Sequence, residues 1–240
     1  MTTDPAPPIA PINASLSTPK KLLLLLANAI PLGQTITLGA IIYFLCMRPW
    51  LCVGVAIAWI YLLPPVFCRI VALLLPIRRE TIPISSRDFF AWWISLNLQV
   101  LFSRFPALEE ALRLVPGLYS LWLRLWGSKI GRLTYWAAGT QIFDRQLLRV
   151  GNHVTFGAGV RLVPHVILPD PTRHNVLLLA PIHIGDHVNV GGHSLLAAGT
   201  HIAPGESTRA FLILPPLGRL ENGHRHKSRV GAVPLPPESA

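Results

Sequence analysis

The second half of the chain repeats an apolar residue at every sixth position, and this period restricts the possible folds more than any other feature. The repeat runs in three registers, and a small residue often follows the apolar one. The registers contain Ile130-Gly131, Trp136-Ala137, Ile142 and Leu148, then Val150-Gly151, Phe156-Gly157, Leu162 and Leu168, then Ile184-Gly185, Val190-Gly191, Leu196-Ala197 and Ile202-Ala203. An amphipathic helix repeats at about 3.6 residues and a β-meander at about two, so neither explains a step of six.

A step of six is typical of a chain that winds around a triangular prism. One apolar side chain per face points into the narrow interior, and the small residue after it lets the chain turn the corner. Three faces make a coil of about 18 residues, and stacked coils align their apolar residues across neighbouring strands. The sequence therefore predicts a mainly β C-terminal half, a left-handed parallel β-helix of about three such coils over residues 127–206. A basic C-terminal tail is expected over 207–240, where the residues depart from the repeat.

One interval between registers is too long for a single coil. From Val150 to Ile184 the chain advances 34 residues, about 16 more than one coil needs. The extra residues contain Pro169-Asp170-Pro171, a turn-rich sequence that predicts a loop leaving the prism. Loops inserted into a rigid scaffold commonly carry function, so residues beside this insertion are candidates for a site.

The N-terminal third is apolar enough to predict membrane-spanning helices. Only 13% of all residues are charged, about half of the usual fraction, and none of those from Leu22 to Met47 is charged. A helix needs about 20 apolar residues to cross the hydrocarbon core. We therefore expect a disordered Pro-rich tail over 1–19 and an α-helical transmembrane hairpin over 20–79, with spans at about 22–47 and 49–68.

Two alternatives to a spanning hairpin remain. Pro31 and Gly33 would kink the first span, so a pair of re-entrant helices is the first alternative. The second is a cleavable signal peptide ending at Ala29, although its apolar core, Leu22 to Leu26, is shorter than such peptides use.

The charge distribution favours a membrane partner. The net charge of +10 fits an anionic membrane surface or a nucleic acid. Because the basic residues flank apolar runs and form no stripe with aromatic residues, we expect membrane lipid and no nucleic acid. Lys20, Lys21 and the arginines after the second span outnumber Arg48 in the turn, which predicts an integral membrane protein with both hairpin ends and the C-terminal domain on the cytoplasmic side. Residues 80–126 mix aromatic and charged side chains and are expected to form amphipathic interfacial helices.

Five sequence phrases within residues 86–206 carry a family resemblance. They are Trp122 to Gly131, Ile142-Phe-Asp-Arg145, Val150-Gly-Asn-His-Val154, Val163-Pro-His-Val166, and Ile184-Gly through Gly199-Thr200. This half resembles the hexapeptide-repeat acyltransferases, and more closely the membrane-linked branch found at the ends of some non-ribosomal peptide synthetases. The resemblance implies transfer of an acyl group, usually acetyl from acetyl-CoA, to a hydroxyl or amine. It also implies a homotrimer with active sites in the clefts between neighbouring β-helices.

Acyl transfer from a thioester needs a base that takes the proton of the acceptor. His165 precedes the insertion and matches the histidine that the family carries there, so it is our predicted general base. Asp170 in the insertion, or Asp144 one coil earlier, is expected to orient it. By family analogy Gly191, Gly192, His193, Gly199 and Thr200 contact the CoA of acetyl-CoA or another acyl-CoA. No metal is expected. The acceptor would be a lipid-linked sugar, an exopolysaccharide precursor or an amine.

Other residues have competing interpretations. His153 and His187 occupy the same place in their coils, which indicates a structural turn, whereas His193 and His174 are further candidates for the base. Asp144-Arg145 is either a paired surface charge or part of an acceptor pocket.

Two other functions compete with acyl transfer. One is a zinc enzyme of the γ-carbonic-anhydrase type that uses His165, His187 and His193, because zinc prefers imidazole ligands. The other is a membrane-bound β-helix without catalytic activity, which serves as a trimerisation or scaffold module. The loss of the repeat after Glu206 favours the scaffold.

Overall fold

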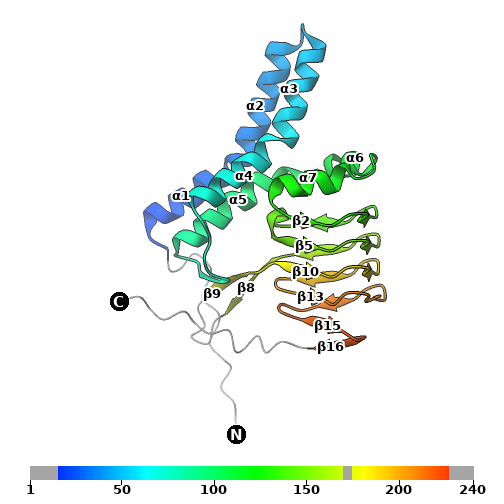
Figure 1. Cartoon of the computed structure of the whole chain (residues 1–240). Helices are drawn as coiled ribbons and strands as arrows, with labels where there is room; N and C mark the ends of the chain where they lie inside the picture. Colours follow the sequence, from blue (N-terminus) through cyan, green and yellow to red (C-terminus); the bar gives the residue numbers. More distant parts are fainter. Residues whose placement is uncertain (1–15, 170–174, 227–240) are drawn as a thin grey trace.

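The computed structural model describes residues 16–169 and 175–226, and its C-terminal half is a stack of short parallel strands on three faces (Figure 1). The first face contains β2(Lys129–Ile130), β5(Leu148–Val150), β10(Ile182–Ile184), β13(His201–Ile202), β15(Arg219–Glu221) and the terminal β16(His224–His226). The second face contains β3(Tyr135–Trp136), β6(Thr155–Phe156) and β11(Asn189–Val190). The third contains β4(Gln141–Ile142), β7(Arg161–Val163), β12(Leu195–Ala197) and β14(Ile213–Leu214). Successive strands visit the three faces in turn, which confirms the mainly β C-terminal half.

The six-residue step is explained by how the coils stack. On the first face Ile130 pairs with Val150, and Val150 with Ile184, so the apolar residues of successive coils lie above one another in the interior. A Cβ atom on Gly131 would lie 2.2 Å from the carbonyl oxygen of Gly151. The small residue after each aliphatic is therefore needed because neighbouring coils approach most closely at that point.

The prism continues beyond the predicted boundary at residue 206. Four coils and the first strand of a fifth are present, instead of about three, and the segment predicted as a tail contains β14, β15 and β16. Leu214 and Leu220 keep the six-residue step from Ile202 and are buried. Thr208 occupies the intervening step, where its hydroxyl accepts a hydrogen bond from the Gly191 amide at 2.8 Å. This one polar residue interrupts the apolar pattern without ending the fold.

The insertion of the second coil forms a hairpin of two strands, where a loop was predicted, and residues 170–174 between the strands lie outside the described residues. β8(His165–Pro169) and β9(Asn175–Leu179) pair antiparallel, and β1(Thr81–Pro83) joins the outer edge of β9. Leu177, Leu179 and Ile167 of the hairpin pack with Ile82 and Trp92. The alternate residues Leu178, Val166 and Leu168 belong to a separate apolar cluster, so both sides of the hairpin are covered. Asp170 and His174 lie outside the described residues.

Seven α-helices and one 3₁₀-helix are present in the described part of the chain. They are α1(Thr18–Asn28), α2(Ile30–Leu45), α3(Pro49–Tyr61), α4(Leu63–Leu74), α5(Arg87–Arg104), α6(Ala107–Arg113), α7(Leu118–Trp126) and η1(Arg145–Leu147). Leu16 is buried against the cluster around Ile82 and α1 starts at Thr18, so the predicted disordered tail over 1–19 is wrong at its last residues.

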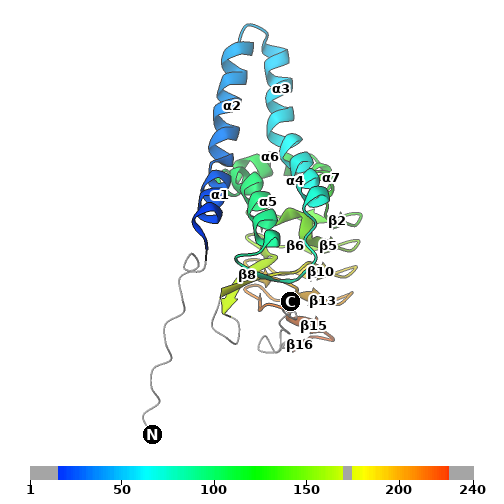
Figure 2. The same ribbon diagram turned by 90° about the vertical axis from the view of Figure 1, so that its left-hand side faces the viewer.

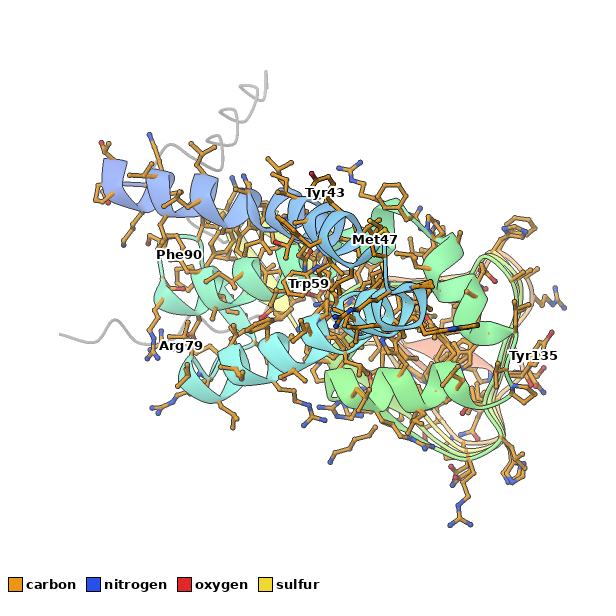
Figure 3. All side chains as sticks on the ribbon, turned by 90° about the horizontal axis from the view of Figure 1, so that it is seen from above. Tyr43, Met47, Trp59, Arg79, Phe90 and Tyr135 are labelled. Atoms are coloured by element: carbon orange, nitrogen blue, oxygen red, sulfur yellow. The ribbon has the colours of Figure 1, made fainter. Side chains whose placement is uncertain are left out.

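Two helical stretches, 18–45 and 49–74, are long and apolar enough to cross a membrane by length and composition. α2 and α3 project as an antiparallel hairpin from the end of the prism (Figures 1 and 2). The exposed fractions of Phe44, Met47 and Trp50 near its tip are 77%, 90% and 89%. Figure 3 views this hairpin from above, with Tyr135 at the margin of the superposed coils. Apolar side chains that are exposed over such a length are costly in water, which is the physical reason to expect lipid around them.

The other helices close the first coil of the prism. α5 is buried on several sides, since Phe89, Trp92 and Phe102 along it are each at most 2% exposed. α7 is amphipathic: it buries Trp122 and Trp126 and leaves Leu121 and Leu125 exposed. Of these two helices, only α7 has the amphipathic character predicted for residues 80–126, whereas α5 belongs to the core that joins the helices to the prism.

Candidate functional site

The centre of the candidate site is a contact between Asp144 and His165, which lie at corners of two stacked coils. Ile142 pairs with Leu162 of the next coil, so the corner after β4 lies above the corner after β7. Asp144 occupies the first corner with φ 45° and ψ 60°, a left-handed conformation that costs a non-glycine residue about 1 kcal/mol. His165 leaves the second corner at the start of β8, and its Nδ1 contacts Oδ2 of Asp144. The structure therefore brings together two of the three residues predicted to be catalytic.

The Asp144 carboxylate is enclosed, and each of its two oxygens has a hydrogen-bond partner. It is 0% exposed, and its Oδ1 accepts a hydrogen bond of 2.8 Å from the indole Nε1–H of Trp92 on α5. The Trp92 ring also contacts the His165 imidazole, with ring centroids 5.1 Å apart and planes at 62°. Phe143 contacts the same imidazole at 6.2 Å and 85°. The imidazole is thus fixed by one carboxylate and two aromatic rings, and 21% of its side chain is exposed.

Two opposing effects act on the pKa of His165. Burial lowers the pKa, because it disfavours the charged imidazolium, but the hydrogen bond and negative charge of Asp144 raise it and outweigh burial. The net direction is upward from 6.5. An imidazole whose Nδ1–H is donated to a carboxylate presents the lone pair of Nε2, which is the tautomer that a general base requires.

Arg145 lies beside this pair and is buried, so the interpretation of Asp144-Arg145 as a paired surface charge is wrong. The two residues are 0% and 1% exposed and do not pair with each other. The Arg145 guanidinium contacts Oε1 of Glu109 on α6, with Nε at 2.8 Å. Tyr119 donates to the other Glu109 oxygen at 2.7 Å, and Arg113 Nη2 lies 3.2 Å from it. A buried charge is tolerated only with such partners, which explains why three side chains converge on Glu109.

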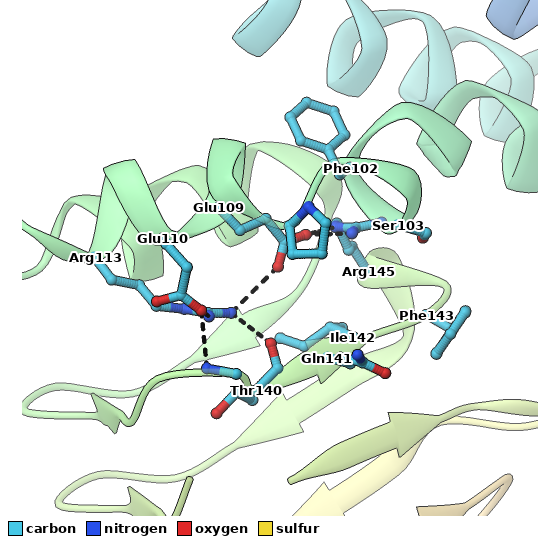
Figure 4. Close-up of a pocket in the computed structure, with 12 residues that line it drawn as sticks. Phe102, Ser103, Glu109, Glu110, Arg113, Thr140, Gln141, Ile142, Phe143 and Arg145 are labelled. Atoms are coloured by element: carbon cyan, nitrogen blue, oxygen red, sulfur yellow. Dashed lines mark hydrogen bonds and ion pairs between the residues drawn. The ribbon is translucent and has the colours of Figure 1, made fainter. Parts of the chain in front are cut away.

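Gln99 connects this network to the corner that carries Asp144. Its Oε1 accepts from the backbone amide of Arg145 at 2.8 Å and from Arg145 Nη1 at 3.2 Å. The residue after Asp144 is therefore held by both its backbone and its side chain. Figure 4 shows the small cavity beside this network, about 60 Å³, with Glu109, Arg113 and Arg145 along its wall. Phe143 lines the same cavity and contacts His165, so the cavity lies one side chain away from the imidazole.

The residues predicted to contact CoA lie at two different corners. Gly191, Gly192 and His193 lie between β11 and β12, where His193 stacks on Phe211 at 5.3 Å. A Cβ atom on Gly191 would lie 2.4 Å from backbone atoms of Arg209, so coil stacking alone requires this glycine.

Gly199 and Thr200 lie between β12 and β13, the corner below the one where the hairpin leaves the prism. The Gly199 amide donates to the Ala180 carbonyl at 3.1 Å, and Gly199 has φ 70°. Thr200 is 0% exposed, so its side chain has no surface to offer a ligand. These two residues are on the same edge of the prism as His165, whereas Gly191, Gly192 and His193 are not.

Three other histidines, His153, His187 and His193, lie at corners of the prism. His153 and His187 have φ values of 56° and 58° and stack with ring centroids 4.7 Å apart, as expected for structural turns. Within one subunit His187, His193 and His165 lie at three different corners of the prism. No group of three or more potential metal-ligating side chains occurs among residues 16–169 and 175–226.

Sequence reasoning missed Trp92, Gln99 and Glu109, although all three contact the corner that carries Asp144. Trp92 lies in a run of aromatic residues, which indicates packing but not a hydrogen-bonded carboxylate. Glu109 precedes Arg113 by four residues, a spacing that usually indicates an exposed helical pair. The sequence feature that could have indicated these partners is the Asp144-Arg145 pair itself, since a buried Asp and a buried Arg each require a partner from another element.

No protein-family model matches the chain, and no curated protein matches its sequence. Among solved structures, it is similar to a hexapeptide-repeat-containing acetyltransferase of Vibrio cholerae, with 16% identity over 54% of this chain and 91% of that one and a TM-score of 0.32. The acetyl coenzyme A complex of such an acetyltransferase from V. cholerae O1 biovar eltor has 15% identity over 55% of this chain and 87% of that one, with a TM-score of 0.32. A maltose O-acetyltransferase of Clostridium difficile 630 has 14% identity over 52% of this chain and 86% of that one, with a TM-score of 0.30.

Proposed function

We propose that the protein is a CoA-dependent acyltransferase of the hexapeptide-repeat kind, with His165 as its general base. The observation that carries this proposal is the contact of His165 Nδ1 with the buried Asp144 carboxylate, which is fixed in turn by Trp92. A carboxylate-oriented imidazole at the base of an inserted hairpin is suited to taking a proton from a hydroxyl or amine.

Each part of the pair has a defined role in the proposed reaction. Nε2 of His165 takes the proton of the acceptor hydroxyl while the acceptor oxygen bonds to the thioester carbonyl carbon, and the carbonyl π electrons move to its oxygen. Asp144 stabilises the resulting imidazolium. When the carbonyl re-forms, the carbon–sulfur bond breaks, and the CoA sulfur leaves with the proton that Nε2 returns. The base is then regenerated and no covalent enzyme intermediate is needed.

Acyl-CoA acts here as a substrate, with acetyl-CoA the first donor to test. Gly199 and Thr200 share the edge of the prism with His165, and we propose that the donor lies along this edge beside Gly199, since Thr200 is fully buried. Gly191, Gly192 and His193 lie one corner away, so they fit a donor that is bound between two β-helices of the proposed homotrimer.

The proposed location is the membrane, with the prism on its cytoplasmic side and an acceptor at the lipid surface. The exposed apolar hairpin α2–α3 and the exposed leucines of α7 support this location. The repeat continues past Glu206, so the feature that favoured a purely structural scaffold is removed.

The test is acetyl-CoA binding and hydrolysis by the full chain in detergent, with His165→Ala as the variant. We expect both proteins to bind acetyl-CoA in calorimetry and only the unchanged protein to hydrolyse the thioester, with water as a poor acceptor. Hydrolysis that persists in His165→Ala would move the base to His193 or His174. Absence of binding by both proteins would contradict acetyl-CoA as the donor.

A further inference from the structure

The first face of the prism carries an unbroken column of basic side chains. Strand pairing places six residues side by side across its six strands. In order they are Lys129, Arg149, His183, His201, Arg219 and His226. Five of them are exposed and Arg149 is half-buried. We call this set the basic column. Lys, Arg and His together occupy about one position in eight of the chain, so six in succession are not expected from composition alone.

Neither of the two other faces of the prism carries a comparable column of basic residues at its outward positions in the described part of the chain. The outward residues in register on the second face are Tyr135, Thr155, Asn189 and Ser207, which carry no charge. On the third face they are Gln141, Arg161, Leu195 and Ile213. The fold itself requires only that the inward residues be apolar. The fold therefore does not determine the outward residues of the first face, and their basic character is available for binding a ligand.

The column is a row of like charges that repel one another and favour an anion. Lys129, Arg149 and Arg219 supply cationic side chains, and the three histidines supply further N–H donors. The pKa of His183 is lowered by burial and by the neighbouring His201 and Arg149, and Glu80, which precedes β1, opposes this.

Acidic side chains near the column are few among the described residues. Glu80 acts on His183, and Glu221 pairs in register with His224 at the far end of the face. The column thus keeps an excess of positive charge.

The shape and direction of the column restrict the anion. Neighbouring strands are about 4.8 Å apart, so six rungs span about 24 Å in a single straight row. The row starts at β2, beside the helices, and runs down the prism away from α2 and α3 (Figure 1). It also passes the base of the hairpin that carries His165, because β9 leads directly into the prism at β10. A ligand that follows it is long, narrow and extended along the prism axis.

We propose that the basic column binds a linear anionic polysaccharide with one carboxylate on each sugar, such as a uronic acid chain. One sugar residue is close in length to one strand spacing, so a chain of about six sugars covers the whole column and places several of its carboxylates within reach of the basic side chains. Acidic side chains on one side of an extended peptide recur at about 6.8 Å, a spacing that does not match the distance of about 4.8 Å between neighbouring basic residues of the column. Single-stranded nucleic acid is bound on aromatic platforms, and the column contains no Phe, Tyr or Trp.

The experiment uses the full chain in detergent and a fluorescein-labelled oligogalacturonate of about eight sugars, followed by anisotropy at low salt. The test variant is Lys129→Gln with Arg219→Gln, and the matched control is Arg132→Gln with Arg161→Gln, exposed residues outside the column. We expect about tenfold weaker binding for the test variant, since each exposed ion pair contributes a factor of about 1.5 to 5, and less than twofold for the control.

Several results would overturn the inference. One is equal loss in test and control variants, and another is equally tight binding of a two-sugar fragment. Equally tight, column-dependent binding of polyphosphate or oligothymidylate would replace the polysaccharide as ligand. Displacement of the probe by CoA, with the same dependence on the column, would make this face the nucleotide site. His165→Ala should keep the binding, so a failure of the proposed catalysis and a failure of this inference are distinguishable.

Discussion

Replacing Asp144 by Asn tests the site most directly, because it removes a charge and preserves the shape. The side-chain oxygen of Asn can still accept from the Trp92 indole, but its amide nitrogen then faces His165 Nδ1. The imidazole must turn Nδ1 into an acceptor, which places its proton on Nε2 and removes the base. Loss of the orienting carboxylate in comparable pairs lowers the rate about 10²- to 10⁴-fold, or about 3–5 kcal/mol in the activation barrier.

The pH profile separates this effect from simple damage to the fold. In the unchanged protein hydrolysis should rise with pH around a midpoint above 6.5, because Asp144 raises the pKa of His165 more than burial lowers it. In Asp144→Asn only burial remains, so the midpoint of the residual activity should move below 6.5. The assay is release of the CoA thiol from acetyl-CoA between pH 5 and pH 9.

The same substitution also changes how stability depends on pH. The raised pKa of folded His165 means that its protonation stabilises the fold fully below about pH 6.5, and this contribution is lost as the pH rises through the folded pKa. Asp144→Asn should reverse that dependence, because burial alone lowers the pKa of folded His165 and protonation of the imidazole then opposes folding. Asp186→Asn is the matched control, since Asp186 is an exposed corner residue that accepts from the Asn152 amide at 2.6 Å. An unchanged rate and an unmoved midpoint in Asp144→Asn would refute the assignment of the pair.

Three further predictions concern the residues around the site and the end of the prism. Trp92→Phe removes the donor to Asp144 and should cost about 1–3 kcal/mol of unfolding free energy, with a lower rate and a shifted pH midpoint. Glu109→Gln leaves the buried Arg145 without its carboxylate and should cost about 3–5 kcal/mol in denaturant unfolding. Leu214→Ala should cost about 2–5 kcal/mol and reduce amide protection in the fourth coil, because Leu214 is 1% exposed in its interior.

Each of these predictions has a neighbouring control. Phe90→Leu changes an aromatic residue on the same helix without a bond to Asp144, Glu110→Gln changes a more exposed carboxylate, and Ile213→Ala changes an outward residue that is 62% exposed. Unfolding free energies within about 0.5 kcal/mol of the original protein are expected for Ile213→Ala. Full protection of the fourth coil in Leu214→Ala would argue that this coil does not depend on its interior ladder.

The sequence predicts the prism well because its period is enforced by stacking. The stacking of coils requires an aliphatic residue at each inward position and a small residue at each corner. The positions Ile142 and Leu162 can therefore be aligned from the repeat alone. The same alignment places Asp144 level with Pro164, the residue directly before His165, so the repeat brings the two side chains to the same corner. The fourth coil was missed because a single Thr208 replaces the expected aliphatic residue and its hydroxyl bonds a backbone amide instead.

The partners from the helices could not be predicted in the same way. Trp92 and Asp144 are 52 residues apart, and Arg145 and Glu109 are 36 apart, with no repeat that connects them. Their contact depends on how α5 and α6 dock on the first coil, and that docking is determined by apolar packing spread over many residues. Local patterns describe the surface of each helix but not the element against which it packs.

The division of the site among three elements has a consequence for how the protein matures. Asp144 belongs to the first coil, His165 to the hairpin that leaves the second, and Trp92 to a helix that follows the apolar N-terminal segments. A newly made chain whose helices have not yet closed over the prism has an Asp144 that water still reaches and an imidazole without its indole neighbour. Under the proposed mechanism, full reactivity is then among the last properties that the chain acquires, and a molecule that stalls before closure reacts with thioesters more slowly than a closed one.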